Sequence, residues 1–336
     1  PEFSMKQISF AQAEHQNKQK VTRRERFLAQ MEALMPWQRL IGALSPSYFP
    51  TSAGKRGRPP IGLERMLRIY FLQQWYALAD EALEDAIYDS QAMRDFIGID
   101  LAIESVPDAT TLLRFRHLLE KHALTQRIFE EINASLADQG LFMREGTIVD
   151  ATIVAAAPST KNKAKQRDPE MKQTRKGNQW FFGMKAHIGV DAVTGLTHSV
   201  AATSANVADV TMTGHLVRED DKRIYGDAGY LGMENYLGEN KHDPDTRCCA
   251  AARRGAIKRM EDSRKKALLL AFEKTKASIR AKVEHPFHVV KNLFGYRKVR
   301  YQGLAKNQAQ LLSLFALANL VLAGRCQRHL GGGSVS

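Results

Sequence analysis

The chain has 336 residues, of which 44% are hydrophobic and 25% charged, as expected of a globular protein with a substantial core. Its formal net charge is +13, and this excess of cations favours a polyanionic partner, most simply nucleic acid. Between Arg253 and Lys306 there are 16 Lys or Arg residues and only 4 Asp or Glu residues. Nearly the whole excess therefore lies in one block, which we expect to lie along the polyanion.

Several classes of protein are disfavoured. The three cysteines, Cys248, Cys249 and Cys326, fit neither a disulfide framework nor a zinc site, and they favour a reducing compartment. The N-terminal residues contain no apolar core of a signal peptide. The longest apolar stretch, Leu311 to Gly324, is too short to span a bilayer, so we predict a buried helix and no membrane partner.

The first part of the chain is predicted to be all-helical. We assign 1–22 to a vector-derived leader and a flexible arm, and 23–140 to a helical N-terminal domain. Its short helices resemble a helix-turn-helix assembly, which implies a role in DNA binding. The best candidate for a recognition helix is Ala109 to His122, where Arg114 and Arg116 are the candidate DNA contacts. Basic residues on a surface helix also commonly serve solubility alone.

A short basic motif, Lys55-Arg56-Gly57-Arg58-Pro59-Pro60, lies inside this region. An Arg-Gly-Arg-Pro sequence can follow a DNA minor groove, with Arg56 and Arg58 reaching its floor. The alternative is a basic linker before a helix that has proline near its first position. Both interpretations stay open from the sequence.

At Gly146 the hydrophobic period changes from 3.6 to 2, which predicts the start of a β-rich domain over 146–330. Thr147 to Val154 forms a strand with Asp150 in its middle. A carboxylate among Ile and Val is costly unless it is paired or binds a metal. Asp150 is therefore a candidate functional residue.

A basic loop is predicted over 157–179, and it leads into Trp180-Phe181-Phe182. Cations beside aromatic side chains suit a strand of nucleic acid, which needs both charge neutralisation and stacking. Trp180 is the candidate for such stacking, whereas Phe181 and Phe182 fit the start of a core strand better.

The chain then continues through a hairpin, a helix at Val207 to Arg218 and a short strand that ends directly before Asp227. A carboxylate that leaves a buried strand into a glycine turn is well placed to face a cleft. A basic, irregular insertion is predicted at about 240–263, then a mostly helical stretch to Phe294 with a kink at Pro286, an apolar closing helix, and a flexible tail at 331–336.

A third carboxylate lies within the helical stretch. On a helix, Arg280, Glu284 and Lys291 fall on one face, so that one carboxylate lies between two long cations. A solvated amphipathic helix would look the same when considered alone. Asp150 and Asp227 change this interpretation, because three carboxylates on two strands and a late helix follow the order of an RNase H-like nuclease core. Such a set can hold two Mg²⁺ ions for in-line phosphoryl transfer.

These motifs together resemble the DDE transposases of bacterial insertion sequences, specifically the insertion-sequence-five group. The resemblance covers nearly the whole chain. It rests on Gly57-Arg58-Pro59, on Thr147-Ile148-Val149-Asp150-Ala151-Thr152, on Asn178 to Asp191 including Lys185, on Asp227-Ala228-Gly229-Tyr230, and on the spacing of Arg280, Glu284 and Lys291. One position departs from the family pattern, because Ala277 stands where the family has tyrosine.

The resemblance implies a fold, a chemistry and partners. The fold is a helical DNA-binding domain followed by an RNase H-like mixed α/β core. Asp150, Asp227 and Glu284 would be catalytic ligands of Mg²⁺, with Mn²⁺ as a substitute. Arg280 and Lys291 would bind DNA phosphates, and Lys185 is a further candidate DNA contact. The implied partners are transposon-end DNA, target DNA and a second copy of the chain, in the bacterial cytoplasm at the nucleoid.

Two alternatives remain. A nuclease or junction resolvase built on the same core would cut DNA without joining it. A DNA-binding regulator derived from a transposase would bind without cutting, although the intact set of three acids argues against this.

Overall fold

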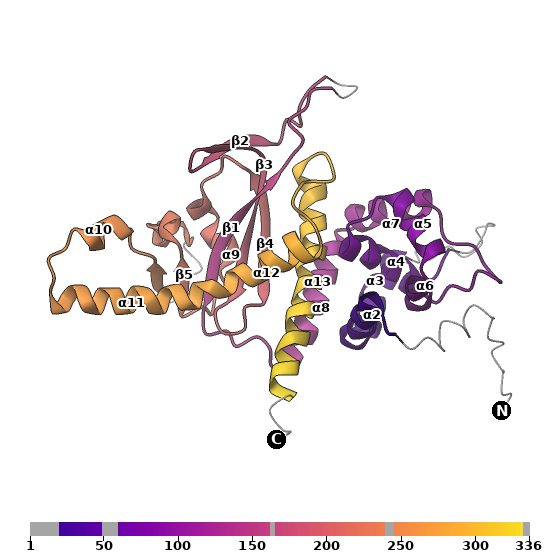
Figure 1. Cartoon of the computed structure of the whole chain (residues 1–336), viewed down its shortest axis with the longest axis horizontal. Helices are drawn as coiled ribbons and strands as arrows, with labels where there is room; N and C mark the ends of the chain where they lie inside the picture. The colour runs from indigo at the N-terminus through magenta and orange to yellow at the C-terminus, as the bar shows by residue number, and fades with distance from the viewer. Residues whose placement is uncertain (1–19, 49–59, 162–164, 239–244, 332–336) are drawn as a thin grey trace. The chain divides into compact units, whose positions relative to one another are not determined.

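The computed structural model of the chain describes residues 20–48, 60–161, 165–238 and 245–331 (Figure 1). They fall into two compact units, one within residues 1–121 and the other within residues 122–336. The predicted N-terminal arm up to residue 19, the tail from residue 332, and both Arg56 and Arg58 lie outside the described residues.

The first unit is entirely helical over its described residues, as predicted. Its central helix, α4, has its apolar side chains buried on nearly every side. Aromatic rings from neighbouring helices pack around it: Trp75 of α4 meets Phe96 edge to face, with ring centroids 5.6 Å apart. The helices are α2 (Arg23–Leu34), α3 (Trp37–Tyr48), α4 (Leu63–Tyr76), α5 (Asp80–Asp89), α6 (Gln91–Ile97) and α7 (Ala109–Lys121).

The next helix, α8 (Leu124–Asp138), belongs to the second unit, whereas the sequence predicts it as part of the N-terminal helical domain. It packs against the long C-terminal helix α13 (Leu304–Gly331), and the two lie side by side in Figure 1. Asn133 of α8 accepts a hydrogen bond from Asn319 of α13 and donates one to the carbonyl of Thr197. These partly buried polar contacts fix α8 to the second unit.

The second unit is built on a mixed sheet. Strands β1 (Thr147–Ala155), β3 (Gln179–Asp191) and β4 (Thr197–Ser204) are antiparallel neighbours in the order β4-β3-β1. Strands β5 (Arg223–Gly226) and β6 (Arg247–Ala250) continue the sheet on the other side of β1 and run parallel to it. This mixed arrangement is consistent with an RNase H-like core.

Two strands lie in segments that the sequence predicts to be irregular. Strand β2 (Lys172–Lys176) lies in the predicted basic loop and pairs with the first part of β3. Strand β6 lies in the predicted basic insertion. The predicted helix at 207–218 was also wrong in extent, because this segment forms only the 3₁₀ turn η1 (Asp209–Met212) and the short helix α9 (Thr213–Leu216).

The predicted helical stretch before Phe294 is divided. It consists of α10 (Arg254–Lys258), α11 (Arg264–Arg280), the 3₁₀ turn η4 (Ala281–Val283), α12 (Glu284–His288) and the π-helical turn η5 (Val289–Leu293). The predicted break at Pro286 therefore extends over several turns of different pitch, and Glu284 is the first residue of α12.

The closing helix is buried, as the sequence predicted. Among the described residues, one helical segment, Leu304–Cys326 of α13, is long and apolar enough to cross a membrane. Its most apolar window is 83% buried within the protein, and its side chains pack against β4 and α8. The segment thus forms part of the core of the second unit.

Candidate active site

Asp150 lies in the middle of β1, opposite Ile188 of β3. The strand around it is apolar, with Ile148, Val149 and Val154 all buried. The Asp150 side chain is partly buried, and its Oδ1 accepts a hydrogen bond of 2.7 Å from the N–H of Ala151. The sheet therefore holds this carboxylate at a fixed position.

Asp227 follows the last residue of β5. Since β5 pairs in parallel with β1, matching Thr147 with Ile224 and Ile148 with Tyr225, continuing this register brings Asp227 beside Asp150. Asp227 caps the 3₁₀ turn η2 (Ala228–Tyr230), and its Oδ1 accepts a hydrogen bond of 2.8 Å from the N–H of Gly229. The glycine turn thus orients the second carboxylate.

Two lysines tie the segment that carries Glu284 to the sheet. Lys282 donates a hydrogen bond of 2.7 Å to the carbonyl of Ala192, beyond the end of β3. Lys291 donates one of 2.6 Å to Thr152 Oγ1 and one of 2.8 Å to the carbonyl of Ile153, both in β1. Glu284 is exposed between these two attachments, so the helix crosses the sheet with its carboxylate toward solvent.

The three carboxylates line one cleft, whose volume is about 860 Å³. Arg280 and Lys291 line it too, which places both cations beside the acids. Other cations and a fourth carboxylate complete the lining: Arg175, Lys176, Lys185, Asp209 and Arg297. The cleft therefore combines acidic and basic groups, the two kinds that a metal-dependent reaction on a phosphate backbone requires.

The pKa of Asp150 is raised to about 7. Burial is the main cause, and the hydrogen bond from Ala151 opposes it. The negative charges of Asp227 and Glu284 raise this pKa further, whereas the positive charge of Arg280 lowers it. These four groups therefore lie close enough to influence one another.

The donor set has the chemistry of a hard-cation site, because all three candidate ligands are carboxylates. Mutual repulsion among them is what a bound divalent cation would relieve. Within the described residues, however, no group of three or more His, Cys, Asp or Glu side chains is already arranged to hold a metal ion. The chemistry fits a divalent metal, and the side chains would have to converge on it.

Other predicted site residues have different environments. Trp180 is 64% exposed on β3, where it pairs with Arg175 of β2. Lys185 is engaged inside the protein, because its Nζ lies 2.8 Å from Asp209 Oδ1 and donates to the carbonyl of Val207 at 2.7 Å. The structure thus leaves Trp180 open to a partner and places Lys185 in an internal ion pair.

The two arginines of the predicted recognition helix also differ. Arg114 is exposed and lines a cavity of the helical unit. Arg116 is only 7% exposed, and its guanidinium forms a salt bridge with Asp80 and a hydrogen bond with Gln73. Arg116 therefore belongs to the core of the helical unit.

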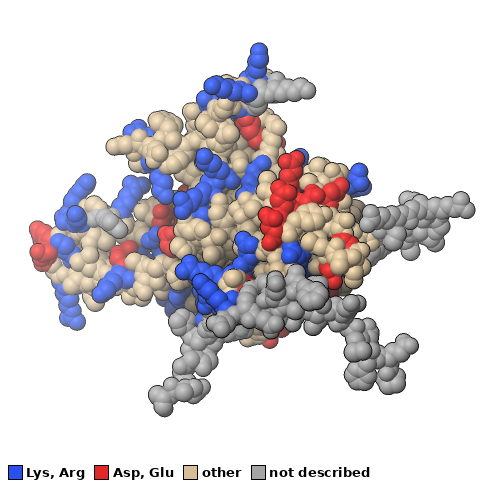
Figure 2. All heavy atoms as spheres, turned by 45° about the vertical axis from the view of Figure 1, so that its right-hand side comes forward, with Lys and Arg blue, Asp and Glu red and all other residues tan. Residues whose placement is uncertain are grey.

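Two contributions to the cleft are not predicted by the sequence. Asp209 falls within a segment whose sequence predicts an ordinary helix, and no local signal marks it. Arg175 and Lys176 lie in the predicted basic loop, and only the pairing of β2 with β3 places them at the cleft. Figure 2 shows lysine and arginine side chains over much of the visible surface, so positive charge alone could not have singled out these residues.

Comparison with known protein families gives two matches. Residues 141–320 match the model of the transposase DDE domain, and residues 15–118 match the transposase domain (DUF772). No solved structure matches the chain. The first match spans more than half of the chain and includes Asp150, Asp227 and Glu284. The chain belongs to the family of DDE transposases.

Proposed function

We propose that the protein is an insertion-sequence transposase of the insertion-sequence-five group, which cuts DNA at the ends of its element and joins them to target DNA. Family membership indicates a DNA transposase. The observation that supports the finer proposal is that Asp150, Asp227 and Glu284, from three separate elements, line one cleft together with Arg280 and Lys291.

In the proposed reaction, the three carboxylates hold divalent metal, Mg²⁺ or Mn²⁺. The metal would supply the Lewis acidity that activates the attacking oxygen and stabilises the leaving oxygen. Convergence of three carboxylates without a cation is opposed by their mutual repulsion, which adds to the larger effect of burial in raising the pKa of Asp150. The protein's own contribution is to fix β1, β5 and α12 so that their carboxylates face the same cleft.

The cations of the cleft position the DNA backbone. Burial lowers the pKa of Lys291, and repulsion from Lys176 and Arg297 lowers it further. A phosphate between these groups would relieve this repulsion. Arg280 lines the cleft close enough to Asp150 for its charge to lower the pKa of that carboxyl group. The exposed ring of Trp180 offers a surface on which a base can stack. Arg116 is not included in the proposed DNA surface, because it is buried.

The same cleft would act twice. Water first attacks a phosphodiester at the element end, and the bond to the leaving oxygen breaks to free a 3′-hydroxyl. That hydroxyl then attacks a phosphodiester of target DNA and displaces a second 3′-hydroxyl, so that one phosphodiester forms as another breaks. Two element ends must be held together, so we propose that a dimer acts on DNA.

The test is to incubate the protein with duplexes that carry candidate element ends, a supercoiled target and Mg²⁺, and to map cut phosphates and joined products. We expect Asp150→Asn, Asp227→Asn and Glu284→Gln each to lower cleavage by at least about 10³-fold. Binding of end DNA should stay within about threefold of wild type, since the cations remain. Glu219→Gln, at an exposed position, serves as the matched control.

Three outcomes would contradict the proposal. Cleavage by Asp150→Asn at the wild-type rate would remove the acids from the chemistry. Cleavage without joined products would assign a nuclease, and binding without cleavage by the wild type would assign a regulator.

A further inference from the structure

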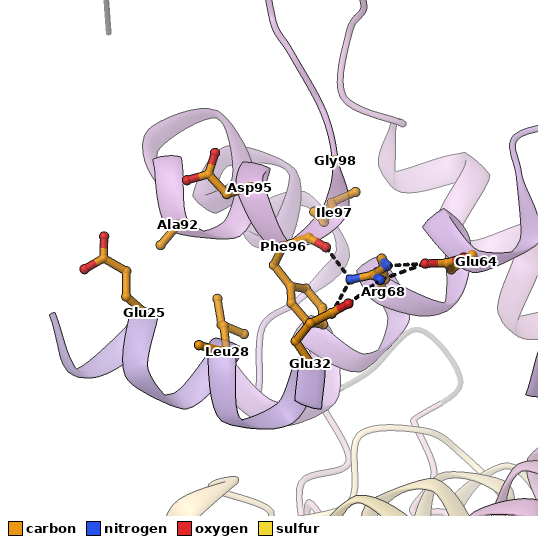
Figure 3. Close-up of a pocket in the computed structure, with 11 residues that line it drawn as sticks. Glu25, Leu28, Glu32, Glu64, Arg68, Ala92, Asp95, Phe96, Ile97 and Gly98 are labelled. Carbon is orange, nitrogen blue, oxygen red and sulfur yellow. Dashed lines mark hydrogen bonds and ion pairs between the residues drawn. The ribbon is translucent and has the colours of Figure 1, made fainter. Parts of the chain in front are cut away.

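The polar groups inside the protein differ in whether they have hydrogen-bond partners. In the helical unit, a cavity of about 530 Å³ is lined by α2, α4 and α6, and Figure 3 shows its side chains. Its guanidinium, that of Arg68, forms ion pairs with Glu32 and Glu64 and donates a hydrogen bond of 2.7 Å to the carbonyl of Phe96. The cavity's own residues therefore satisfy this cation.

Tyr230 of the second unit is the opposite case. Its side chain is only 1% exposed, and its hydroxyl is buried without a hydrogen-bond partner among the described residues. Burying a hydroxyl without a partner costs free energy, and a phenylalanine would fill the same space without that cost. Such a hydroxyl points to a partner that another state of the protein supplies.

The strands that precede the acids hold the Tyr230 ring in place. The ring packs in one buried cluster with Val149, the residue before Asp150, and with Ile224 of β5. At Gly226, the last residue of β5, a Cβ would stand 2.7 Å from Tyr230 Cβ and 2.9 Å from its Cγ, so the tyrosine lies directly against this backbone. The position of the ring is therefore fixed relative to both β1 and β5.

The Tyr230 hydroxyl lies close enough to the carboxylates of the cleft for their charges to act on it. Burial raises the pKa of Tyr230, and the negative charges of Asp150, Asp209 and Asp227 raise it further. The turn η1, which carries Asp209, also packs against η2, which carries Tyr230. The phenol therefore keeps its proton and can donate it in a hydrogen bond to a neighbouring anion.

The three neighbouring carboxylates differ in what they already bind. Asp209 has a counter-charge, because Lys185 Nζ lies 2.8 Å from its Oδ1. Asp150 and Asp227 each accept one hydrogen bond from a backbone N–H at Oδ1, and the charge of Asp227 acts unfavourably on that of Asp150. Carboxylates that bind metal are commonly held by further hydrogen-bond donors around them. Asp150 and Asp227 are therefore the acceptors that fit.

We propose that Tyr230 is a positioning residue of the active site, whose hydroxyl donates a hydrogen bond to Asp150 or Asp227 when the three acids converge on a divalent cation. The hydroxyl has no partner in the described part of the chain, so this hydrogen bond would form only in the converged arrangement and would favour it. Metal binding would thus satisfy a donor that the metal-free fold leaves unsatisfied. The inference rests on the proposed metal-binding role of the acids.

The first test is the stability of Tyr230→Phe without metal. Phenylalanine keeps the ring and removes only the hydroxyl, so this variant should unfold in urea at the same midpoint as wild type or at a higher one. Tyr296→Phe is the matched control. Tyr296 is 2% exposed, but its hydroxyl donates a hydrogen bond of 3.0 Å to Asn307 Oδ1, and loss of this bond should lower the midpoint.

The second test is metal affinity, measured by calorimetric titration of Mn²⁺ into the DNA-free proteins. Tyr230→Phe should bind Mn²⁺ about tenfold more weakly than wild type, as expected when a metal ligand loses a hydrogen-bond donor. Tyr296→Phe should bind Mn²⁺ as wild type does. The two variants should therefore show opposite patterns, which a purely structural role of Tyr230 would not produce.

The end-cleavage assay separates positioning from DNA binding. At limiting Mn²⁺, the kcat of Tyr230→Phe should fall, whereas its KM for end DNA should stay within about twofold of wild type. A rise in KM with unchanged kcat would assign the hydroxyl to DNA binding and overturn the proposal.

A double substitution tests the choice of acceptor. In an Asp209→Asn background, Tyr230→Phe should again weaken Mn²⁺ binding by about tenfold, because groups that share no interaction have additive effects. If the effect of Tyr230→Phe disappears in this background, the hydroxyl donates to Asp209 and the proposal is overturned.

Two results separate failure of this inference from failure of the proposed function. A lower urea midpoint of Tyr230→Phe with unchanged Mn²⁺ affinity would show that the hydroxyl has a partner in the metal-free protein, and it would overturn the inference alone. Identical Mn²⁺ titrations of wild type and Asp150→Asn would show that the acids do not hold the metal, and they would overturn both.

Discussion

Lys291 Nζ lies 2.8 Å from the carbonyl oxygen of Ile153, three residues beyond Asp150 on β1. The same ammonium group donates a hydrogen bond to Thr152 Oγ1. This lysine therefore connects the segment that carries Glu284 with the strand that carries Asp150, and the spacing of these two acids depends on it.

Lys291→Met should lower the free energy of unfolding by about 1–2 kcal/mol, because two partly buried hydrogen bonds are lost. Cleavage should fall as well. Of the two lysines that attach the α12 segment to the sheet, only Lys282 would remain. Urea denaturation and the end-cleavage assay measure the two effects. Lys306→Met, at an exposed position, is the control and should change stability by less than about 0.5 kcal/mol. Equal stability of the two variants would contradict this role of Lys291.

Gly189 of β3 is expected to be intolerant of any side chain. A Cβ at this position would stand 2.1 Å from the carbonyl oxygen of Leu216 and 2.9 Å from the His198 ring, so backbone would have to move in a central strand. We expect Gly189→Ala to cost at least about 3 kcal/mol or to prevent folding, as overpacking of a rigid core does. Gly255→Ala, where the added Cβ meets nothing within 4 Å, should change stability by less than about 1 kcal/mol.

Local sequence patterns predicted the elements that carry the acids. The alternation around Asp150 marked β1, and the short apolar run before Asp227 marked β5. Both signals are local, because side chains of a strand alternate between a buried and an open face. The late helical stretch was equally visible from its period.

Contacts distant in sequence could not be predicted in this way. The short strand β6 carries little alternation, and only its pairing with β5 shows that it belongs to the sheet. Arg116 resembles a surface cation, and only the position of Asp80 on another helix explains its burial. The same applies to Asp209 and Lys185, whose ion pair joins η1 to β3. Tertiary packing determines these pairings and this burial, and the periodicity of the sequence does not predict them.

Asp150 should make the metal-free protein more stable at low pH than at high pH. Its pKa is raised from 3.8 to about 7 in the folded state, so the folded state binds the proton more tightly than the unfolded state does. This contribution is fully present below about pH 4 and is lost as the pH rises to about 7. Asp150→Asn has no such proton, so its stability relative to wild type should increase over this interval and stay constant above it.

The measurement is the free energy of unfolding of both proteins between pH 4 and pH 8, with a chelator present. The stability of Asp150→Asn relative to wild type should change by at most a few kcal/mol between the two ends of this pH range, because the pKa change sets that limit. Glu219→Gln, which alters an exposed carboxylate, should show no such trend. A difference between Asp150→Asn and wild type that is independent of pH would contradict the raised pKa.

Added divalent metal should reverse this instability of the wild type. A cation that binds only the folded state stabilises it by RT ln(1 + [L]/Kd), about 2.7 kcal/mol at one hundred times the Kd. Mg²⁺ or Mn²⁺ should therefore raise the Tm of the wild type at pH 8 by several degrees, and the rise should shrink at pH 5, where Asp150 is protonated.

The three acids can be separated in the same experiment. Asp150→Asn, Asp227→Asn and Glu284→Gln should each lose most of the metal-dependent rise in Tm, while Glu219→Gln retains it. The side chains must converge to bind metal. Metal binding should therefore also protect the amide hydrogens of η2 and α12 from exchange. Binding to a preformed site would give no such protection. A metal-dependent rise in Tm that persists in each of the three variants would show that the metal binds elsewhere. The carboxylates of the cleft would then have a role other than metal binding.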